Sequence, residues 1–181
     1  NPFLQQIENE STGFSEEKIK LPEKMLSTDK AYSWEEINKW LERITKFSKE
    51  INYSFNSIQI KGTAKLDGFA GFDDGVKLYT RGDGKKGSDI SRVFERGLGV
   101  FNDSERGQGP GEIVVKRSYF EKHLSNHFEY PRNFQASLIK EKELDKFAIN
   151  AISTKAALFV PFTQLPQWVG SINEFSDQFL D

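Results

Sequence analysis

Lys65 and Asp67, two positions apart in the stretch "GTAKLDGF", are the residues whose types and spacing most directly suggest chemistry. A lysine amine attacks an electrophile only when it is neutral, and from a reference pKa of about 10.4 roughly 0.04% is neutral at pH 7. Burial and nearby cations raise that fraction. The run "SIQIKGTAKL" predicts a strand over residues 57–66, in which Lys65 is buried and Asp67 lies on the same side. The alternative is a lysine that extends to solvent and pairs with Asp67.

The loop "RGDGKKGS" at residues 81–88 combines glycines with charges and supports two interpretations. Its backbone N–H groups could bind a phosphate, with Arg81 adding a bidentate contact, or the loop is a plain turn. It is not a Walker A motif, because that motif needs a lysine directly before the serine, where this chain has Gly87. The loop also contains the Arg-Gly-Asp tripeptide that adhesion receptors bind, a role that does not fit an intracellular chain.

His123 and His127 are four residues apart in a predicted helix, "SYFEKHLSNHF" (118–128), and would lie on one of its faces. Two histidines at this spacing could bind a metal ion. The sequence places no third ligand beside them, so a solvated helix face is the simpler interpretation.

The composition indicates a globular, ordered chain of 181 residues with a formal net charge of −2. That charge gives no global basic field for non-specific binding to nucleic acid, although a local basic surface is compatible with it. The absence of cysteine excludes disulfides, thiolate metal sites and cysteine nucleophiles, and is typical of a reducing compartment. No apolar run approaches the roughly 20 residues that span a bilayer, and no signal peptide is visible. We therefore expect a cytoplasmic protein and, because the chain starts with Asn, a piece of a longer one.

Short strands and helices alternate without a regular βαβ rhythm, which favours an α+β fold with largely antiparallel sheets. Ser33 and Glu36 form a capping box, and apolar residues at helical spacing predict a helix over about 34–50. Its apolar stripe, expected to face the core, consists of Ile37, Trp40, Leu41, Ile44, Phe47 and Ile51. Further strands are expected at "GVKLYT", "EIVVKR" and "ALFVPF", a short helix in "SDISRVFERGLG" that stops at Gly97, a loop at 102–111, and a break at "YPRNF".

Several motifs together resemble one family, the NAD-dependent DNA ligases of bacterial type. "KLDG" (65–68) resembles the KxDG nucleotidyl-lysine motif, and "TRGDGKKGSDIS" (80–91) resembles the family's TRGDGxxGEDxT stretch, with Ser88 in place of the usual Glu. The remaining landmarks are "GE" (111–112) for the (R)GE motif, "FEYPRNFQASLI" (128–139) for FxNPRNxxAGSLR, and "LPEKMLSTDKAYSWEEI" (21–37) for the start of the adenylation domain. They follow the family's order across nearly the whole chain, so the combination is far more specific than any one motif.

The resemblance implies a nucleotidyltransferase fold, with antiparallel sheets flanked by helices, and an adenylation reaction. The motif lysine, here Lys65, attacks the α-phosphate of NAD, expels nicotinamide mononucleotide and holds AMP as a phosphoramidate. By the same resemblance Asp67 is its motif partner, Arg81 and Glu112 contact the ribose, and Arg132 lies near the phosphate. The family further implies Mg²⁺ as a cofactor, nicked duplex DNA as a partner in repair and replication, no membrane, and action as a monomer.

The boundaries and departures qualify this expectation. We expect a lead-in segment over 1–22 and the N-terminal part of a divergent, truncated adenylation domain over 23–181. Thr63 stands where the family usually has a Glu that reads the adenine amino group, and Ile139 and Lys140 occupy the stretch of the second arginine after "PRN". The upstream helical domain and the downstream lysine motifs are absent from the sequence. Two alternatives therefore stay open, an ATP-dependent polynucleotide ligase and a non-catalytic nucleotide- or DNA-binding module with the ligase fold.

Overall fold

The computed structural model describes residues 18–27 and 29–179, which form two compact units. One unit contains residues 18–27 and 65–165, and the other contains 29–64 and 166–179. Most of the lead-in segment expected at 1–22 lies outside the described residues. Within the described ranges, no helix is both long and apolar enough to cross a bilayer.

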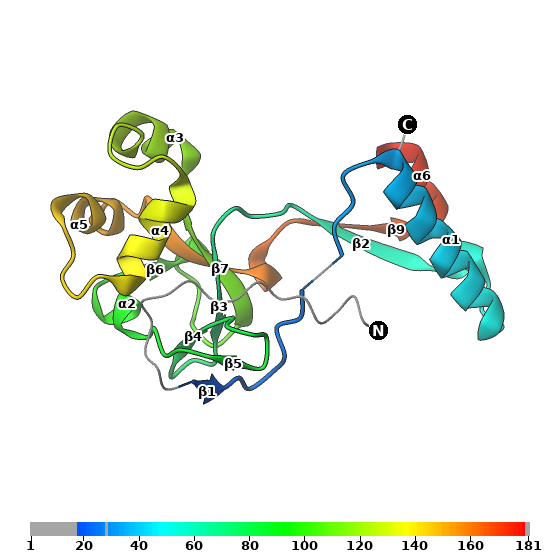
Figure 1. Cartoon of the computed structure of the whole chain (residues 1–181), viewed down its shortest axis with the longest axis horizontal. Coiled ribbons are helices and arrows are strands. Elements are labelled where there is room, and N and C mark those ends of the chain that lie inside the picture. Colours follow the sequence, from blue (N-terminus) through cyan, green and yellow to red (C-terminus); the bar gives the residue numbers. More distant parts are fainter. Residues whose placement is uncertain (1–17, 28, 180–181) are drawn as a thin grey trace. The chain divides into compact units, whose positions relative to one another are not determined.

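The larger unit is built on a five-stranded sheet with the strand order β4-β3-β7-β8-β6 (Figure 1). Neighbouring strands are antiparallel, except for the parallel pair β6 and β8. A separate two-stranded ribbon pairs β1 with β5. The strands are β1 (Ile19–Lys20), β3 (Phe69–Asp73), β4 (Leu78–Thr80), β5 (Lys86–Gly87), β6 (Gly99–Val100), β7 (Gly109–Val115) and β8 (Ala157–Pro161).

Helices pack against this sheet and close its core, which confirms the expected α+β class. Ile113 of β7, Phe159 of β8 and Phe134 of α4 are fully buried in one apolar cluster, and burial of each such side chain contributes about 1.5–3 kcal/mol. The helices of this unit are α2 (Arg92–Glu95), α3 (Arg117–Tyr119) with a π-helical turn over Phe120–Leu124, α4 (Pro131–Lys140) and α5 (Lys146–Ser153). Turns of 3₁₀ helix follow β6 at Phe101–Asp103 and β8 at Phe162–Gln164.

The smaller unit contains α1 (Trp34–Glu50), a 3₁₀ turn (Phe55–Ser57), the antiparallel pair β2 (Gln59–Thr63) and β9 (Gln167–Ser171), and α6 (Ile172–Phe179). Half of the expected capping box is confirmed, because the Glu36 N–H donates to Ser33 Oγ at 3.3 Å, whereas the Glu36 carboxylate accepts from the N–H of Tyr32 rather than of Ser33. The expected burial of the whole apolar stripe is wrong. Phe47 and Ile51 are 60% and 55% exposed, since they lie on the last turn of α1 and directly after it.

The preceding helix does end before "YPRNF", as expected, but this stretch also begins a new helix, α4, which the sequence does not predict. Pro131 occupies the first turn, where its missing N–H costs no helical hydrogen bond. The other end of α4 is held by two arginines near α2. Arg92 donates to the carbonyls of Ile139 and Lys140, and Arg96 donates to the carbonyl of Leu138 at 3.2 Å. These side chains satisfy carbonyls that a helix C-terminus otherwise leaves unpaired, so the C-terminal end of α4 is anchored.

Other boundaries differ from the expected ones by a few residues. The "DDG" turn joins β3 to β4, and the helix α2 stops before Gly97, as expected. The loop expected at 102–111 is shorter, because β7 already begins at Gly109. The helix expected over 118–128 ends its π-helical turn at Leu124, and "ALFVPF" forms the fully buried β8.

Candidate functional site

Lys65 lies in a loop, and its predicted burial in a strand is wrong. The strand β2 ends at Thr63, because the ladder with β9 ends with the pair Thr63 and Gln167. Residues 64–67 have no strand partner, and both Lys65 and Asp67 are exposed. A loop without a ladder lets the lysine ammonium stay hydrated, which is the less costly state for a charge. The lysine is therefore available at the surface of the larger unit.

Gly68 brings this loop against the central strand β7. It is buried, and a Cβ at this position would lie 2.5 Å from the Ile113 carbonyl oxygen and 2.7 Å from Glu112 Cγ. Real Cβ atoms do not approach a backbone oxygen so closely, so only glycine permits the contact. The last residue of "KLDG" thus sets the distance between the lysine loop and Glu112.

Glu112 sits in the middle of the sheet, on the side of β7 opposite to the core residue Ile113. Its neighbours across the two ladders are Ala70 of β3 and Val160 of β8. Arg81 follows β4 directly, and its backbone N–H donates to the Ala70 carbonyl at 3.3 Å. The sheet register therefore places the backbone of Arg81 and Glu112 on opposite sides of β3, with Ala70 between them.

Arg132 is the second residue of α4, on the turn where the helix begins. The N-terminus of a helix carries unpaired N–H groups and a partial positive charge, both of which favour an anion. The residue before the helix, Tyr130, makes no side-chain capping hydrogen bond there. The exposed guanidinium of Arg132 and the helix terminus thus present positive charge at the same place.

The charges of the other four predicted site residues all act on the Glu112 carboxyl. Burial raises the pKa of the Glu112 carboxyl, and the negative charge of Asp67 adds to the rise. Positive charges oppose it, and they come from Lys65, Arg132 and Arg81. These residues are supplied by a loop, two strand regions and a helix, yet all act on one carboxyl group. The arrangement is a polar site with a mixed charge, open to solvent at the lysine.

We predict that Glu112→Gln stabilises the fold at neutral pH. A carboxyl whose folded-state pKa is raised contributes stability below its unfolded pKa of about 4.3, and that contribution is lost as the pH rises through the folded pKa. The variant should therefore melt at a higher temperature than the wild type at pH 7, and the difference should vanish below about pH 4. Thermal melts over this pH range measure it. A wild type that melts at the higher temperature at pH 7 would show that the surrounding cations outweigh burial.

Most backbone N–H groups of the 81–88 loop bond to other protein groups, which favours the interpretation of the loop as a plain turn. The N–H groups of Lys85 and Lys86 both donate to Asp83 Oδ1, which lowers the pKa of Asp83. The Gly84 N–H donates to the Arg81 carbonyl, and the Ser88 N–H to Thr80 Oγ1. These amides are used within the turn, and Arg81 contributes to the site through its side chain alone.

The two histidines do not form a metal pair. The His123 ring packs on Tyr119 with centroids 4.6 Å apart, and the His127 ring packs on Phe147 at 4.3 Å. Both are exposed, and His127 lies beyond the π-helical turn. Their contacts are with aromatic rings of different helices, which fits the solvated face that the sequence also allowed.

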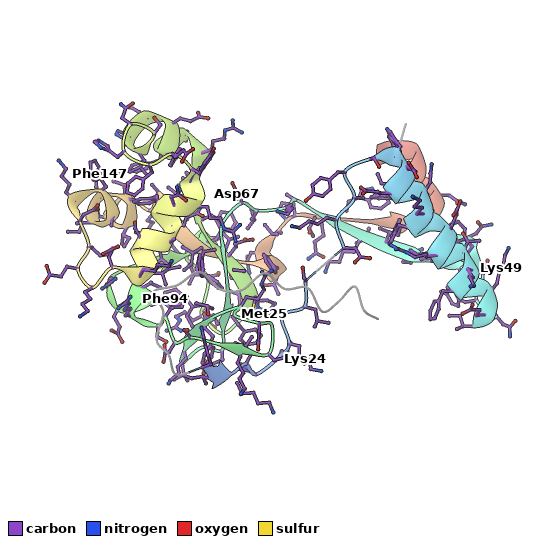
Figure 2. All side chains as sticks on the ribbon, in the orientation of Figure 1. Lys24, Met25, Lys49, Asp67, Phe94 and Phe147 are labelled. Atoms are coloured by element: carbon purple, nitrogen blue, oxygen red, sulfur yellow. The ribbon has the colours of Figure 1, made fainter. Side chains whose placement is uncertain are left out.

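Sequence reasoning missed Gln135, a buried residue of α4 that contacts the lysine loop. Its Nε2 donates to the Asp67 carbonyl at 3.1 Å (Asp67 is labelled in Figure 2). No spacing or composition distinguishes this glutamine in "PRNFQAS", because the stretch was expected to interrupt a helix. A helical assignment would have placed it three residues after Arg132, on the same face.

This α+β domain has an exposed lysine, two arginines and two carboxylates in one site. Such a site places it in the class of proteins whose centre is basic and attracts anions. Comparison with known families makes the assignment specific. The model of the NAD-dependent DNA ligase adenylation domain matches residues 13–152. The chain therefore belongs to the NAD-dependent DNA ligase adenylation domain family.

Curated relatives agree with this assignment. A DNA ligase of Ruthia magnifica subsp. Calyptogena magnifica is 64% identical over 179 residues, 99% of this chain and 29% of the relative. DNA ligases of Vesicomyosocius okutanii and Shewanella baltica are 65% and 52% identical over the same share of this chain, and are covered over 28% of their own lengths. The chain thus spans less than a third of the length of these relatives.

Proposed function

We propose that this chain is the adenylating part of an NAD-dependent DNA ligase and that Lys65 is its nucleophile. The neutral Lys65 amine attacks the α-phosphorus of NAD and forms an N–P bond. The P–O bond to the departing phosphate breaks, nicotinamide mononucleotide leaves, and AMP stays on the enzyme as a phosphoramidate. The proton of the amine passes to solvent, which reaches Lys65 because the residue is exposed. A later transfer of AMP to DNA would activate a nick for sealing.

The observation that carries this proposal is the placement of the Lys65 loop: its Gly68 packs against Glu112, and the Asp67 carbonyl accepts from Gln135 of α4, the helix that also carries Arg132. A nucleophile for a phosphate ester needs cations beside it, because negative charge accumulates on the phosphate oxygens in the transition state. Arg81 and Arg132 supply these cations, and both act on the same carboxyl, that of Glu112. The family match adds that the natural electrophile is a dinucleotide.

The roles of the neighbours follow from their chemistry. Arg132 suits the phosphate, because a guanidinium forms bidentate hydrogen bonds to it and the start of α4 reinforces its charge. Glu112 accepts hydrogen bonds and suits the ribose hydroxyls, with Arg81 as the second ribose contact. Asp67, the aspartate of the KxDG motif, lies two residues after the nucleophile Lys65. The detailed topology is proposed to be the nucleotidyltransferase fold, which the mixed sheet with packed helices supports.

Partners and cofactor complete the proposal. Nicked duplex DNA is the proposed partner, in the cytoplasm and with the protein acting as a monomer. Mg²⁺ stays an expectation, because the described part of the chain has no group of three or more acidic or histidine side chains placed to bind a metal ion. Asp67 and Glu112 are the carboxylates of the site, and magnesium usually needs only one or two together with substrate phosphates.

Adenylation of the full-length protein by NAD, compared with ATP, tests this function. Intact-mass measurement with NAD and Mg²⁺ should show a gain of one AMP and release of nicotinamide mononucleotide. ATP should give no gain. An adduct from ATP alone would favour the ATP-dependent ligase, a donor that Thr63 leaves open. Adenylate binding without any adduct would favour the non-catalytic module.

A further inference from the structure

Gln135 is a buried polar residue with only half of its amide satisfied. Its side chain is 0% exposed. Nε2 donates to the Asp67 carbonyl, 68 positions earlier in the chain, while Oε1 has no hydrogen-bond partner. The orientation of the amide follows from the contact itself, since a carbonyl only accepts and must face the NH₂ group.

This arrangement contributes little to folding. One neutral hydrogen bond stabilises a protein by less than it costs to bury an acceptor without a donor. An apolar side chain of the same shape would avoid that cost. The benefit of the glutamine must therefore lie in what its one bond holds in place.

The bond holds the loop that carries the proposed nucleophile. Residues 64–67 have no strand partner, so they lack the ladder hydrogen bonds that fix a strand. The loop is restrained at Gly68 by its contact with β7 and at Asp67 by Gln135. Because the C-terminal end of α4 is anchored by Arg92 and Arg96 and its apolar face is buried, the helix offers a firm point of attachment.

We propose that Gln135 is a positioning residue for adenylation, which fixes the Lys65 loop through the Asp67 carbonyl. Arg132 lies three residues before Gln135, on the same face of α4. One helix thus sets the position of the phosphate-binding arginine and of the lysine loop together. The orientation of a nucleophile governs the rate of its attack, and a misplacement of about 1 Å can cost about 100-fold. This inference rests on the proposed function of Lys65.

The test compares Gln135→Met with Gln108→Met in the full-length protein. Methionine keeps the length of glutamine and removes both polar atoms. Gln108 belongs to the same unit, is partly exposed and bonds to Ser104, Glu105, Thr163 and Gln164. Gln108→Met is therefore a control that removes more hydrogen bonds than Gln135→Met, none of them to residues 64–68.

Two readouts separate positioning from stability. Hydrogen exchange of a peptide covering residues 64–70 should become about fivefold faster in Gln135→Met, as expected for the loss of one hydrogen bond. The maximal rate of lysine adenylation should fall about tenfold, while the NAD concentration for half-maximal rate and the melting temperature stay close to wild type. Gln108→Met should change neither loop exchange nor adenylation.

Each outcome decides the inference. Unchanged exchange in the loop would overturn it even if the protein proves inactive, because this readout needs no catalysis. Unchanged adenylation with faster exchange would show that the loop position does not limit the reaction. A failure to fold in both Gln135→Met and Gln135→Leu would also contradict it, since the glutamine would then be structural. If the wild type forms no adduct at all, the proposed function fails, and the catalytic part of this inference fails with it.

Discussion

Lys65→Ala should abolish formation of the AMP adduct while leaving the protein folded. The side chain is exposed and lies in a loop without strand partners, so its removal creates no cavity. Surface substitutions of this kind usually change stability by no more than about 0.5 kcal/mol. The reaction, however, loses the atom that forms the bond to phosphorus, and no neighbouring group can replace it. Intact-mass spectra after incubation with NAD measure the result.

Lys61→Ala is the control for this prediction. Lys61 is an exposed lysine of β2, four positions before Lys65, with the same side chain and no place in the site. It should form the adduct at the wild-type rate. An adduct that persists in Lys65→Ala would mean that another lysine is the nucleophile.

Gly68→Ala should slow adenylation by about 100-fold. Among the substitutions proposed here, only Lys65→Ala is expected to have a larger effect. The added methyl group would lie 2.5 Å from the Ile113 carbonyl and 2.7 Å from Glu112 Cγ. Neither the backbone of a central strand nor the partly buried Glu112 can yield without moving the sheet. The lysine loop must therefore shift away from β7, and a shift of about 1 Å is enough for a loss of this size. Single-turnover measurements with NAD give the rate.

Gly62→Ala provides the matched control. A Cβ at Gly62 would meet only Trp168, at 3.8 Å, which is an ordinary contact. The same substitution six positions earlier should therefore leave the adenylation rate within about twofold of wild type, as expected for an unstrained site. Equal, small effects of both alanines would show that the close approach of the loop to Glu112 is not needed.

The sequence proposes which residues form the site, whereas their arrangement comes from the structure. Lys65, Asp67, Arg81, Glu112 and Arg132 came from motifs, and the structure brings them around one carboxyl. The α1 helix was predictable because its cap and its spacing are local signals. Motif matches and helical periodicity depend on residues close in the chain, so both are visible without tertiary structure.

The misplaced features depend on long-range contacts. Lys65 was expected to be buried, but whether its stretch is a strand depends on the partner β9, more than 100 residues later. Helix α4 is not predictable from "YPRNF", because Pro131 signals the end of one helix and only the contacts of the far end with Arg92 show that another begins there. The role of Gln135 depends on a bond across 68 residues. No local pattern carries such information.

The position of the AMP adduct in the chain tests the central claim most directly. The full-length protein would be incubated with NAD, digested, and mapped by tandem mass spectrometry under conditions that preserve phosphoramidates. The adduct should lie on Lys65 and on no other lysine of this chain. An adduct on a different residue, or none on a protein that remains folded, would contradict the assignment of Lys65 as the nucleophile of the site around Glu112.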